Sequence, residues 1–245
     1  MKRKIIAVLL WIAIWACVSL TVKNPLLLAG PWDTLEALVH LAVTADFWLS
    51  LLNTSLHILC GFAVGSLLGI VTAAAAYRYR WFSDFFGVFI QAMKSVPVVS
   101  FVLILLIWAG SRMLSFWIPM LVVMPVLYLN TLKGLDATDR GILEMADVFG
   151  MRVSAKIRTI YLPQLRPYFL SAFSLALGMC WKSGVAAEVI GQPLGTIGNG
   201  LYRAKISLDT ARLFAWTLVI VLLSVLFERI ADLILSRMLV HKPVK

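Results

Sequence analysis

The sequence predicts an all-α, polytopic membrane protein with about six transmembrane helices and one helical loop outside the membrane. Hydrophobic residues make up 61% of the 245 residues and mean hydropathy is +0.92, whereas soluble domains are about 45–50% apolar. Charged residues amount to only 14%, too few to cover a soluble core of this size. The apolar residues also form runs close to the roughly 20 residues that a helix needs to cross a bilayer core of about 30 Å.

Six such runs are expected to span the membrane, within one transmembrane domain over 1–245 whose core is about 51–240. They are 5–22, 51–77, 85–108, 114–132, 168–190 and 213–235. The first run follows Lys2, Arg3 and Lys4, so a cleaved signal peptide is an alternative interpretation. We expect a retained anchor, because the apolar stretch is long and no clear small-x-small cleavage site follows it.

The net charge of +10 is interpreted as membrane topology. Lys and Arg cluster in short stretches between the runs, which is typical of cytoplasmic loops and not of a continuous phosphate-binding face, so we expect no nucleic-acid partner. With the amino terminus inside, both termini are cytoplasmic and most basic residues are inside. The inner set is Lys2, Arg3, Lys4, Arg78, Arg80, Lys133, Arg140, Arg152, Lys156, Arg158, Arg166, Arg237, Lys242 and Lys245. The outer set is Lys23, Arg112, Arg203, Lys205 and Arg212.

The second run carries glycines at every fourth position, at Gly61, Gly65 and Gly69. Residues with this spacing share one helix face, and glycine lets a neighbouring backbone approach closely. We therefore expect this face to pack against another span.

The longest polar segment, 133–167, separates the fourth and fifth runs and is both charged and helically periodic. Asp139 can favour the positive end of a first short helix, and Gly150 offers its stop. A second short helix is expected to start at Ser154, a capping residue type, and to end where Pro163 interrupts the pattern.

This segment resembles the EAA signature of permeases in binding-protein-dependent ATP-binding-cassette (ABC) importers, in which Glu-Ala-Ala is followed by Gly and then by Ile-x-Leu-Pro. The matching residues are Glu144, Met145, Ala146, Gly150, Ile160, Leu162 and Pro163. Met145 replaces the usual Ala, a change that a helix tolerates. The resemblance implies that 139–163 is a cytoplasmic coupling-helix (EAA) loop that docks onto an ATPase subunit.

Three further stretches resemble the nitrate, sulfonate and taurine branch of these permeases. They are Lys94-Ser95-Val96-Pro97, the run from Trp181 to Glu188, and Gly195-Thr196-Ile197-Gly198. The branch implies a bacterial inner-membrane assembly of an ATPase dimer, a second permease and an extracytoplasmic solute-binding protein. The second permease is either another copy of this chain, which makes a homodimer, or a related chain, which makes a heterodimer. ATP and Mg would be bound by the ATPase, since the sequence has no GxxxxGK[ST] string, so no cofactor and no enzymatic activity are expected in this chain. Relatives of this branch take alkanesulfonates, taurine, nitrate or bicarbonate, or pyrimidine vitamin precursors, and among these we expect a small anion such as a sulfonate, taurine or nitrate.

Charged residues inside the fifth run are candidates for the translocation pathway, because charge at membrane depth is costly. Lys182 could offset the charge of an anionic solute or form a structural ion pair, and Trp181 beside it could stack on a ring or cation. Glu188 lies six positions further, about 240° around the helix, so it is not expected to pair with Lys182. Lys94 is interpreted as a snorkelling side chain near the inner interface.

Two rival functions were weighed. A self-contained secondary transporter would also be polytopic, but it has no ATPase to dock and thus no use for the Glu144 to Pro163 unit. An intramembrane enzyme would need a nucleophile with a base, or acidic metal ligands, at membrane depth. The sequence offers no such set: His57 is interpreted as a packing residue, and Cys17, Cys60 and Cys180 lack metal-site spacing. No catalytic or metal-binding residue is therefore predicted.

Overall fold

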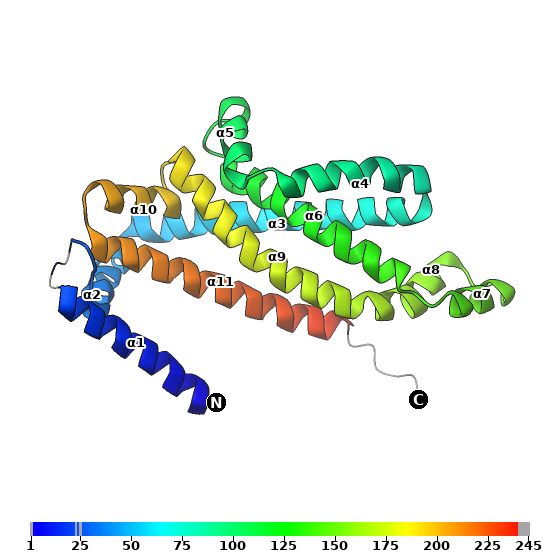
Figure 1. Ribbon diagram of the computed structural model, residues 1–245, viewed down its shortest axis with the longest axis horizontal. Coiled ribbons are helices and arrows are strands. Elements are labelled where there is room, and N and C mark those ends of the chain that lie inside the picture. The colour runs from blue at the N-terminus through cyan, green and yellow to red at the C-terminus, as the bar shows by residue number, and fades with distance from the viewer. Residues whose placement is uncertain (1, 23, 25, 240–245) are drawn as a thin grey trace.

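The computed structural model describes residues 2–22, 24 and 26–239, and every regular element in these residues is a helix (Figure 1). The elements are α1 (Lys2–Val22), α2 (Pro31–Ala42), α3 (Ala45–Arg78), α4 (Arg80–Ser95), α5 (Val98–Ala109), α6 (Leu114–Asp136), α7 (Arg140–Val148), α8 (Val153–Lys156), the π-helix η1 (Ile157–Tyr161), α9 (Leu162–Gly191), α10 (Ile197–Ile206) and α11 (Thr210–Leu239). The predicted all-α fold is confirmed. Lys23, Lys242 and Lys245 of the topology prediction lie outside the described residues.

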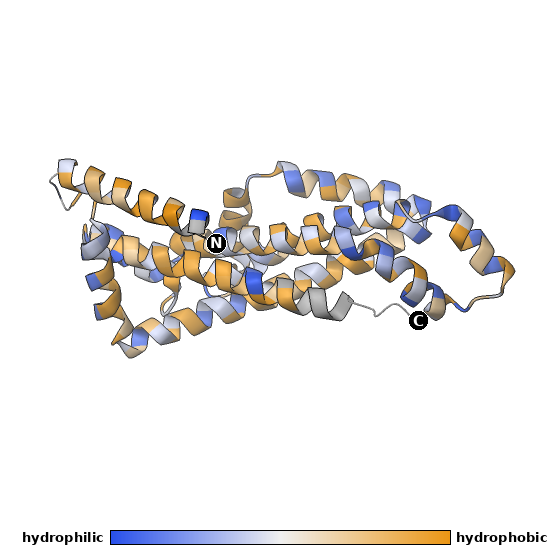
Figure 2. Cartoon of the chain, turned by 90° about the horizontal axis from the view of Figure 1, so that it is seen from below, coloured by the Kyte–Doolittle hydropathy of each residue, from blue (hydrophilic) through white to orange (hydrophobic). Residues whose placement is uncertain are grey.

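Four helical segments are long and apolar enough to cross a bilayer among the described residues. They are Ala45–Arg78, Leu114–Asp136, Val153–Gly191 and Thr210–Ala231. The bent pair α4 and α5 would be a fifth span, and Ile6–Val22 is a shorter apolar helix. The long helices run along the long axis of the molecule, and hydrophilic residues are denser at the end that carries α7 and α8 (Figure 2). The chain is therefore a multi-pass membrane protein.

Helix α3 packs closely along α6 through its glycine face. A Cβ atom on Gly61 would lie 2.2 Å from the carbonyl oxygen of Phe116, and one on Gly65 would lie 2.7 Å from that of Met120. Gly69 approaches the carbonyl oxygen of Met124 in the same way, at 2.6 Å. Only a residue without a side chain fits between two backbones at these distances. The every-fourth glycine spacing thus brings the backbones of α3 and α6 together, as the sequence predicts.

The predicted third span, 85–108, is not one straight helix. It divides into α4 and α5, which are bent by 99° at Val96 and Pro97, so α5 projects sideways from the bundle (Figure 1). Pro97 has no N–H group, and its ring disfavours the helical conformation at Val96, where φ is −76° and ψ is 129°. The run 85–108 is thus a bent pair of helices, which together remain long and apolar enough for one span.

The predicted helix end at Pro163 was also wrong. The chain is helical from Val153 through Gly191, and Pro163 lies in the first turn of α9. Pro163 has no N–H group, so it cannot donate a hydrogen bond to the preceding turn of this continuous segment. The π-helix η1 immediately before it changes the hydrogen-bond register, so the helical path continues into the membrane span.

The opposite end of the bundle is closed by the short helices α2 and α10 (Figure 1). Helix α10 is tied to α3, because the side-chain amide of Asn53 donates to the carbonyl oxygen of Gly195 at 3.0 Å. Inside the bundle, Trp181 of α9 stacks on Phe227 of α11 with ring centroids 5.4 Å apart. This contact joins the two long helices that flank the core.

Candidate functional site

The coupling loop forms a compact helix–glycine–helix unit at one end of the bundle. Asp139 caps α7, since its Oδ1 accepts a hydrogen bond from the amide of Gly141 at 2.8 Å. At the other end of α7, the amide of Met151 donates to the carbonyl oxygen of Ala146 at 2.9 Å, and Gly150 has a φ of +63°. This is a Schellman-type helix end, which favours glycine at the left-handed position. The predicted stop at Gly150 is confirmed.

The two halves of the unit are held together at its base. Lys156 of α8 forms an ion pair with Asp147 of α7, and Ala146 is buried. Ile160 is also buried, and the ring of Tyr161 in η1 meets that of Tyr77 in α3 edge to face, with centroids 6.1 Å apart. The second half of the signature thus fastens the unit to the membrane bundle.

The outer surface of the unit is apolar although it lies beyond the membrane helices. Val148 is 85% exposed and Phe149 is 80% exposed, and Met145 is exposed beside them. Large apolar side chains grouped on the surface of a polar segment typically mark a protein–protein contact. Val148 and Phe149 were not among the predicted coupling residues, but two apolar residues before a helix-ending glycine in a charged segment are a signal that could have identified them.

The structure separates the three candidate pathway residues of α9. Trp181 and Glu188 are fully buried inside the bundle, whereas Lys182 is exposed on a different face of the helix. Lys182 and Glu188 do not form an ion pair among the described residues, in keeping with their angular separation. In this conformation only Lys182 is placed where a solute could reach it, and its role in a pathway remains a prediction.

Glu188 belongs to a buried polar cluster that joins α9, α3 and α10. Its Oε2 accepts hydrogen bonds from the hydroxyl of Thr54 at 2.9 Å and from the amide of Gly198 at 3.0 Å. The same hydroxyl accepts a hydrogen bond from the amide of Ile197 at 3.0 Å. The carboxylate therefore lies at the start of α10, where the helix dipole favours negative charge.

Glycine is required at position 198 for this cluster to form. A Cβ atom there would lie only 2.2 Å from the Cβ of Glu188, so a larger residue would push α10 away from α9. Thr54 is the member that the sequence did not reveal, since a lone threonine in an apolar run carries no signal of its partner.

The fold defines a class of protein: a multi-pass membrane protein with an apolar loop beyond its membrane helices on one side. A family model described as the binding-protein-dependent transport system inner membrane component matches residues 65–240. The chain belongs to this family. It is a family of transport permeases of ABC systems, and not of enzymes.

Several relatives support the same assignment. The taurine transport system permease protein TauC of Escherichia coli (strain K12) is 25% identical over 223 residues, which cover 87% of this chain and 80% of the relative. SsuC of Escherichia coli (strain K12), a permease named for aliphatic sulfonates, is 26% identical over 186 residues, covering 75% of this chain and 70% of the relative. SsuC of Bacillus subtilis (strain 168) is 25% identical over 235 residues, covering 93% and 83%. The resemblance to the nitrate, sulfonate and taurine branch is confirmed.

Proposed function

We propose that this chain forms the solute pathway of a bacterial ABC importer, as a single permease domain in the inner membrane with both termini in the cytoplasm. The observation that supports this function best is the apolar tip formed by Met145, Val148 and Phe149 on a rigid unit outside the membrane helices. A self-contained carrier has no partner to cover such a tip. A cytoplasmic ATPase dimer, which binds ATP and Mg, is the partner that would bury it.

The geometry of the unit suits mechanical coupling. Helices α8, η1 and α9 follow one another as a 39-residue helical segment, Val153–Gly191, from the tip into the membrane. At about 1.5 Å of rise per residue, this segment is roughly 58 Å long. Closure of the ATPases would move the tip, and the segment would carry that motion to Lys182 as a rigid body. The π-helix η1 marks a position where the segment can adjust its register.

The proposed assembly includes a second copy of this chain and an extracytoplasmic solute-binding protein at the end that carries α2 and α10. Relatives are named for taurine and for aliphatic sulfonates, and one that is 23% identical over 158 residues is named for bicarbonate. All three solutes carry an anionic group at neutral pH. We therefore propose a small anion as the solute of this permease.

Co-purification tests the docking role of the tip. The chain is expressed with the ATPase and binding protein encoded beside it and purified on a tag, as the unaltered protein and as a Val148→Glu, Phe149→Glu double variant. Two buried carboxylates would be unpaired in the interface, so we expect the variant to lose the ATPase while it still inserts in the membrane.

The matched control is Leu194→Glu, which places a carboxylate on a residue that is 79% exposed in the loop between α9 and α10. This variant should retain the ATPase. If neither the unaltered chain nor the control recruits an ATPase, the proposed function is refuted and a secondary carrier becomes the better hypothesis.

A further inference from the structure

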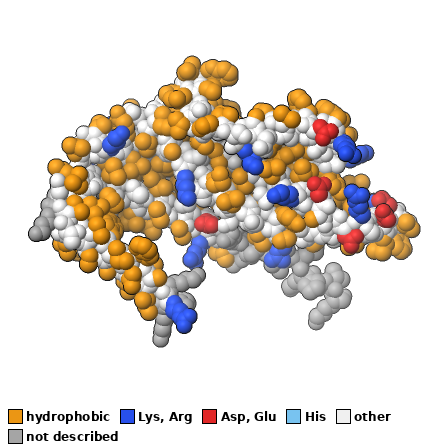
Figure 3. Space-filling model, in the orientation of Figure 1, with side chains coloured by type: hydrophobic (Ala, Val, Ile, Leu, Met, Phe, Trp, Pro, Cys, Tyr) orange, Lys and Arg blue, Asp and Glu red, His pale blue; other side chains and the backbone are white. Residues whose placement is uncertain are grey.

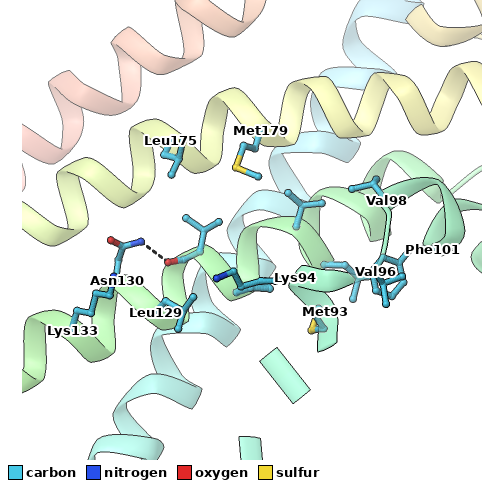
Figure 4. A pocket seen from close by; sticks show the side chains of 14 residues that line it. Met93, Lys94, Val96, Val98, Phe101, Leu129, Asn130, Lys133, Leu175 and Met179 are labelled. Carbon is cyan, nitrogen blue, oxygen red and sulfur yellow. Dashed lines mark hydrogen bonds between the residues drawn. The ribbon is translucent and has the colours of Figure 1, made fainter. Parts of the chain in front are cut away.

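Two neighbouring hollows form one groove on the face made by α6, α9 and the bent pair α4 and α5. The first has a volume of about 350 Å³ and is lined mainly by apolar side chains (Figure 4). The second, of about 330 Å³, shares Val98, Val122 and Met179 with the first. We call the two hollows together the lysine groove, because Lys94 and Lys133 line the first and Lys182 lines the second.

The three lysines are exposed, and none of them has a carboxylate within 4.0 Å among the residues that the structure describes. Glu228 borders an adjoining hollow together with Lys182, but its Oε1 accepts a hydrogen bond from the hydroxyl of Ser174 at 2.6 Å. In Figure 4, Lys94 lies between Lys133 and Val98 along the groove. The first hollow is therefore bordered by two unpaired lysines, Lys94 and Lys133, and Lys182 borders the apolar second hollow with the aliphatic part of its side chain.

Two of these ammonium groups lie deep in the membrane-spanning part of the fold. Along α4, Lys94 is about 21 Å from Arg80, and along α9, Lys182 is about 14 Å from Gly191. The hydrocarbon core is about 30 Å thick. Lys182 is in the interior of α9, and Lys94 is in the last turn of α4, at the break before α5. An unpaired lysine at such depth is costly against lipid and is usually found facing a water-filled cavity. The interpretation of Lys94 as a snorkelling side chain stays a prediction.

The break between α4 and α5 supports a hydrated groove independently. Val96 and Pro97 have extended backbone conformations and are exposed at this depth. Non-helical backbone within the membrane is tolerated only where protein buries it or water reaches it. Val96 and Val98 both line the first hollow, so the backbone break opens into the groove, and the start of α5 adds the positive end of a helix dipole there.

We propose that the lysine groove is the binding path of a small organic anion, which passes Lys182, Lys94 and Lys133 in turn. This inference rests on the proposed function and assigns the residues that select the charge of the solute. The ammonium groups bind the anionic head, and the walls formed by residues such as Val122 and Met179 contact its aliphatic body. Several weak sites in series allow an ion to enter and also to leave. The second permease copy closes the open side of the groove.

Charge-selective labelling of a cysteine in the groove tests the inference. Val122→Cys is introduced into a Cys17→Ser, Cys60→Ser background, and buried Cys180 is retained. The complex with its ATPase is reconstituted in liposomes. The rates of modification by an anionic reagent, 2-sulfonatoethyl methanethiosulfonate, and by a cationic one, 2-trimethylammonioethyl methanethiosulfonate, are compared after correction for their intrinsic reactivity.

We expect the sulfonate reagent to react roughly tenfold faster, because a groove lined by one sign of charge concentrates the opposite ion. Lys94→Gln with Lys182→Gln should bring the ratio of the two rates close to one. The matched control, Lys94→Arg with Lys182→Arg, keeps both charges and should keep the preference. All four substitutions are at exposed positions, so they should not disturb folding.

Equal rates for the two reagents in the unaltered groove would overturn the inference, as would a ratio that the glutamine variants leave unchanged or a Val122→Cys thiol that neither reagent reaches. A preparation that retains the ATPase but fails the charge test refutes the lysine groove alone. A preparation that recruits no ATPase refutes the proposed function, and the inference with it.

Discussion

Gly61→Ala is the most direct test of how α3 and α6 are held together. The added Cβ would lie 2.2 Å from the carbonyl oxygen of Phe116 and 3.1 Å from its carbonyl carbon. Both atoms belong to the backbone of α6, so no side-chain rotation can relieve the clash. Restoring an ordinary contact of 3.4 Å requires the two helices to separate by about 1.2 Å at this point.

The size of the effect follows from two opposing contributions. Overpacking of a close interface costs about 1–3 kcal/mol, and a backbone clash should be at the upper end. The higher helix propensity of alanine returns up to about 1 kcal/mol. We therefore expect a net loss of about 2 kcal/mol in the free energy of unfolding. In a membrane this loss is not recovered elsewhere, because helix association depends on close packing and not on the exclusion of water.

Gly87→Ala is the matched control, since no described heavy atom lies within 4 Å of the position of its Cβ. It should be neutral or stabilising by up to about 1 kcal/mol. The assay is unfolding of the purified protein in mixed detergent micelles with increasing dodecyl sulfate, followed by tryptophan fluorescence from the nine Trp residues. If Gly61→Ala is as stable as Gly87→Ala, the close approach of α3 and α6 is not what stabilises the bundle.

Three further predictions concern single residues. Thr54→Val removes a hydrogen bond from buried Glu188 and an acceptor from the start of α10. It should lower the free energy of unfolding by about 1–3 kcal/mol and raise hydrogen exchange in α10. Unchanged exchange would contradict the role of Thr54 in holding α10. Trp181→Ala should destabilise the fold by about 3–5 kcal/mol in the same micelle assay. Trp181→Phe should cost much less, because its ring can still stack on Phe227 of α11. Equal losses for the two variants would show that the stack contributes little. Alanine is strained at a φ of +63°, so Gly150→Ala should destabilise the end of α7 by about 1–2 kcal/mol. The measurement is hydrogen exchange of the Met151 amide, which should become faster. An amide that stays protected would show that the helix end tolerates a side chain.

The positions of the membrane helices could be predicted because run length and hydropathy act locally. Helices α3, α6, α9 and α11 contain the runs 51–77, 114–132, 168–190 and 213–235. The stop at Gly150 could be predicted for the same reason, since a left-handed residue at a helix end is a local backbone requirement. Local rules failed at prolines, because Pro97 breaks its helix whereas the helix continues through Pro163.

The candidate site was predicted unevenly. The coupling residues are contiguous, so Glu144 to Pro163 could be recognised as one unit before any fold was known. The exposed tip at Val148 and Phe149 was missed, although two apolar residues before the helix-ending Gly150 in a charged segment were a signal for it. The lysine groove was missed as a unit for a related reason: its members lie on three separate elements, α4, α6 and α9.

By itself the sequence determined that this protein is helical and membrane-spanning, that α3 presents a glycine face, and that a short helix in the polar segment after α6 ends at Gly150. These properties depend on composition and on periodicities of a few residues, which any folded arrangement must respect. The tertiary structure alone decided that Trp181 and Glu188 face inward while Lys182 faces the groove. Sequence spacing gives only the angle between residues on a helix, and the packing of α3, α10 and α11 against α9 decides which side of that helix is buried.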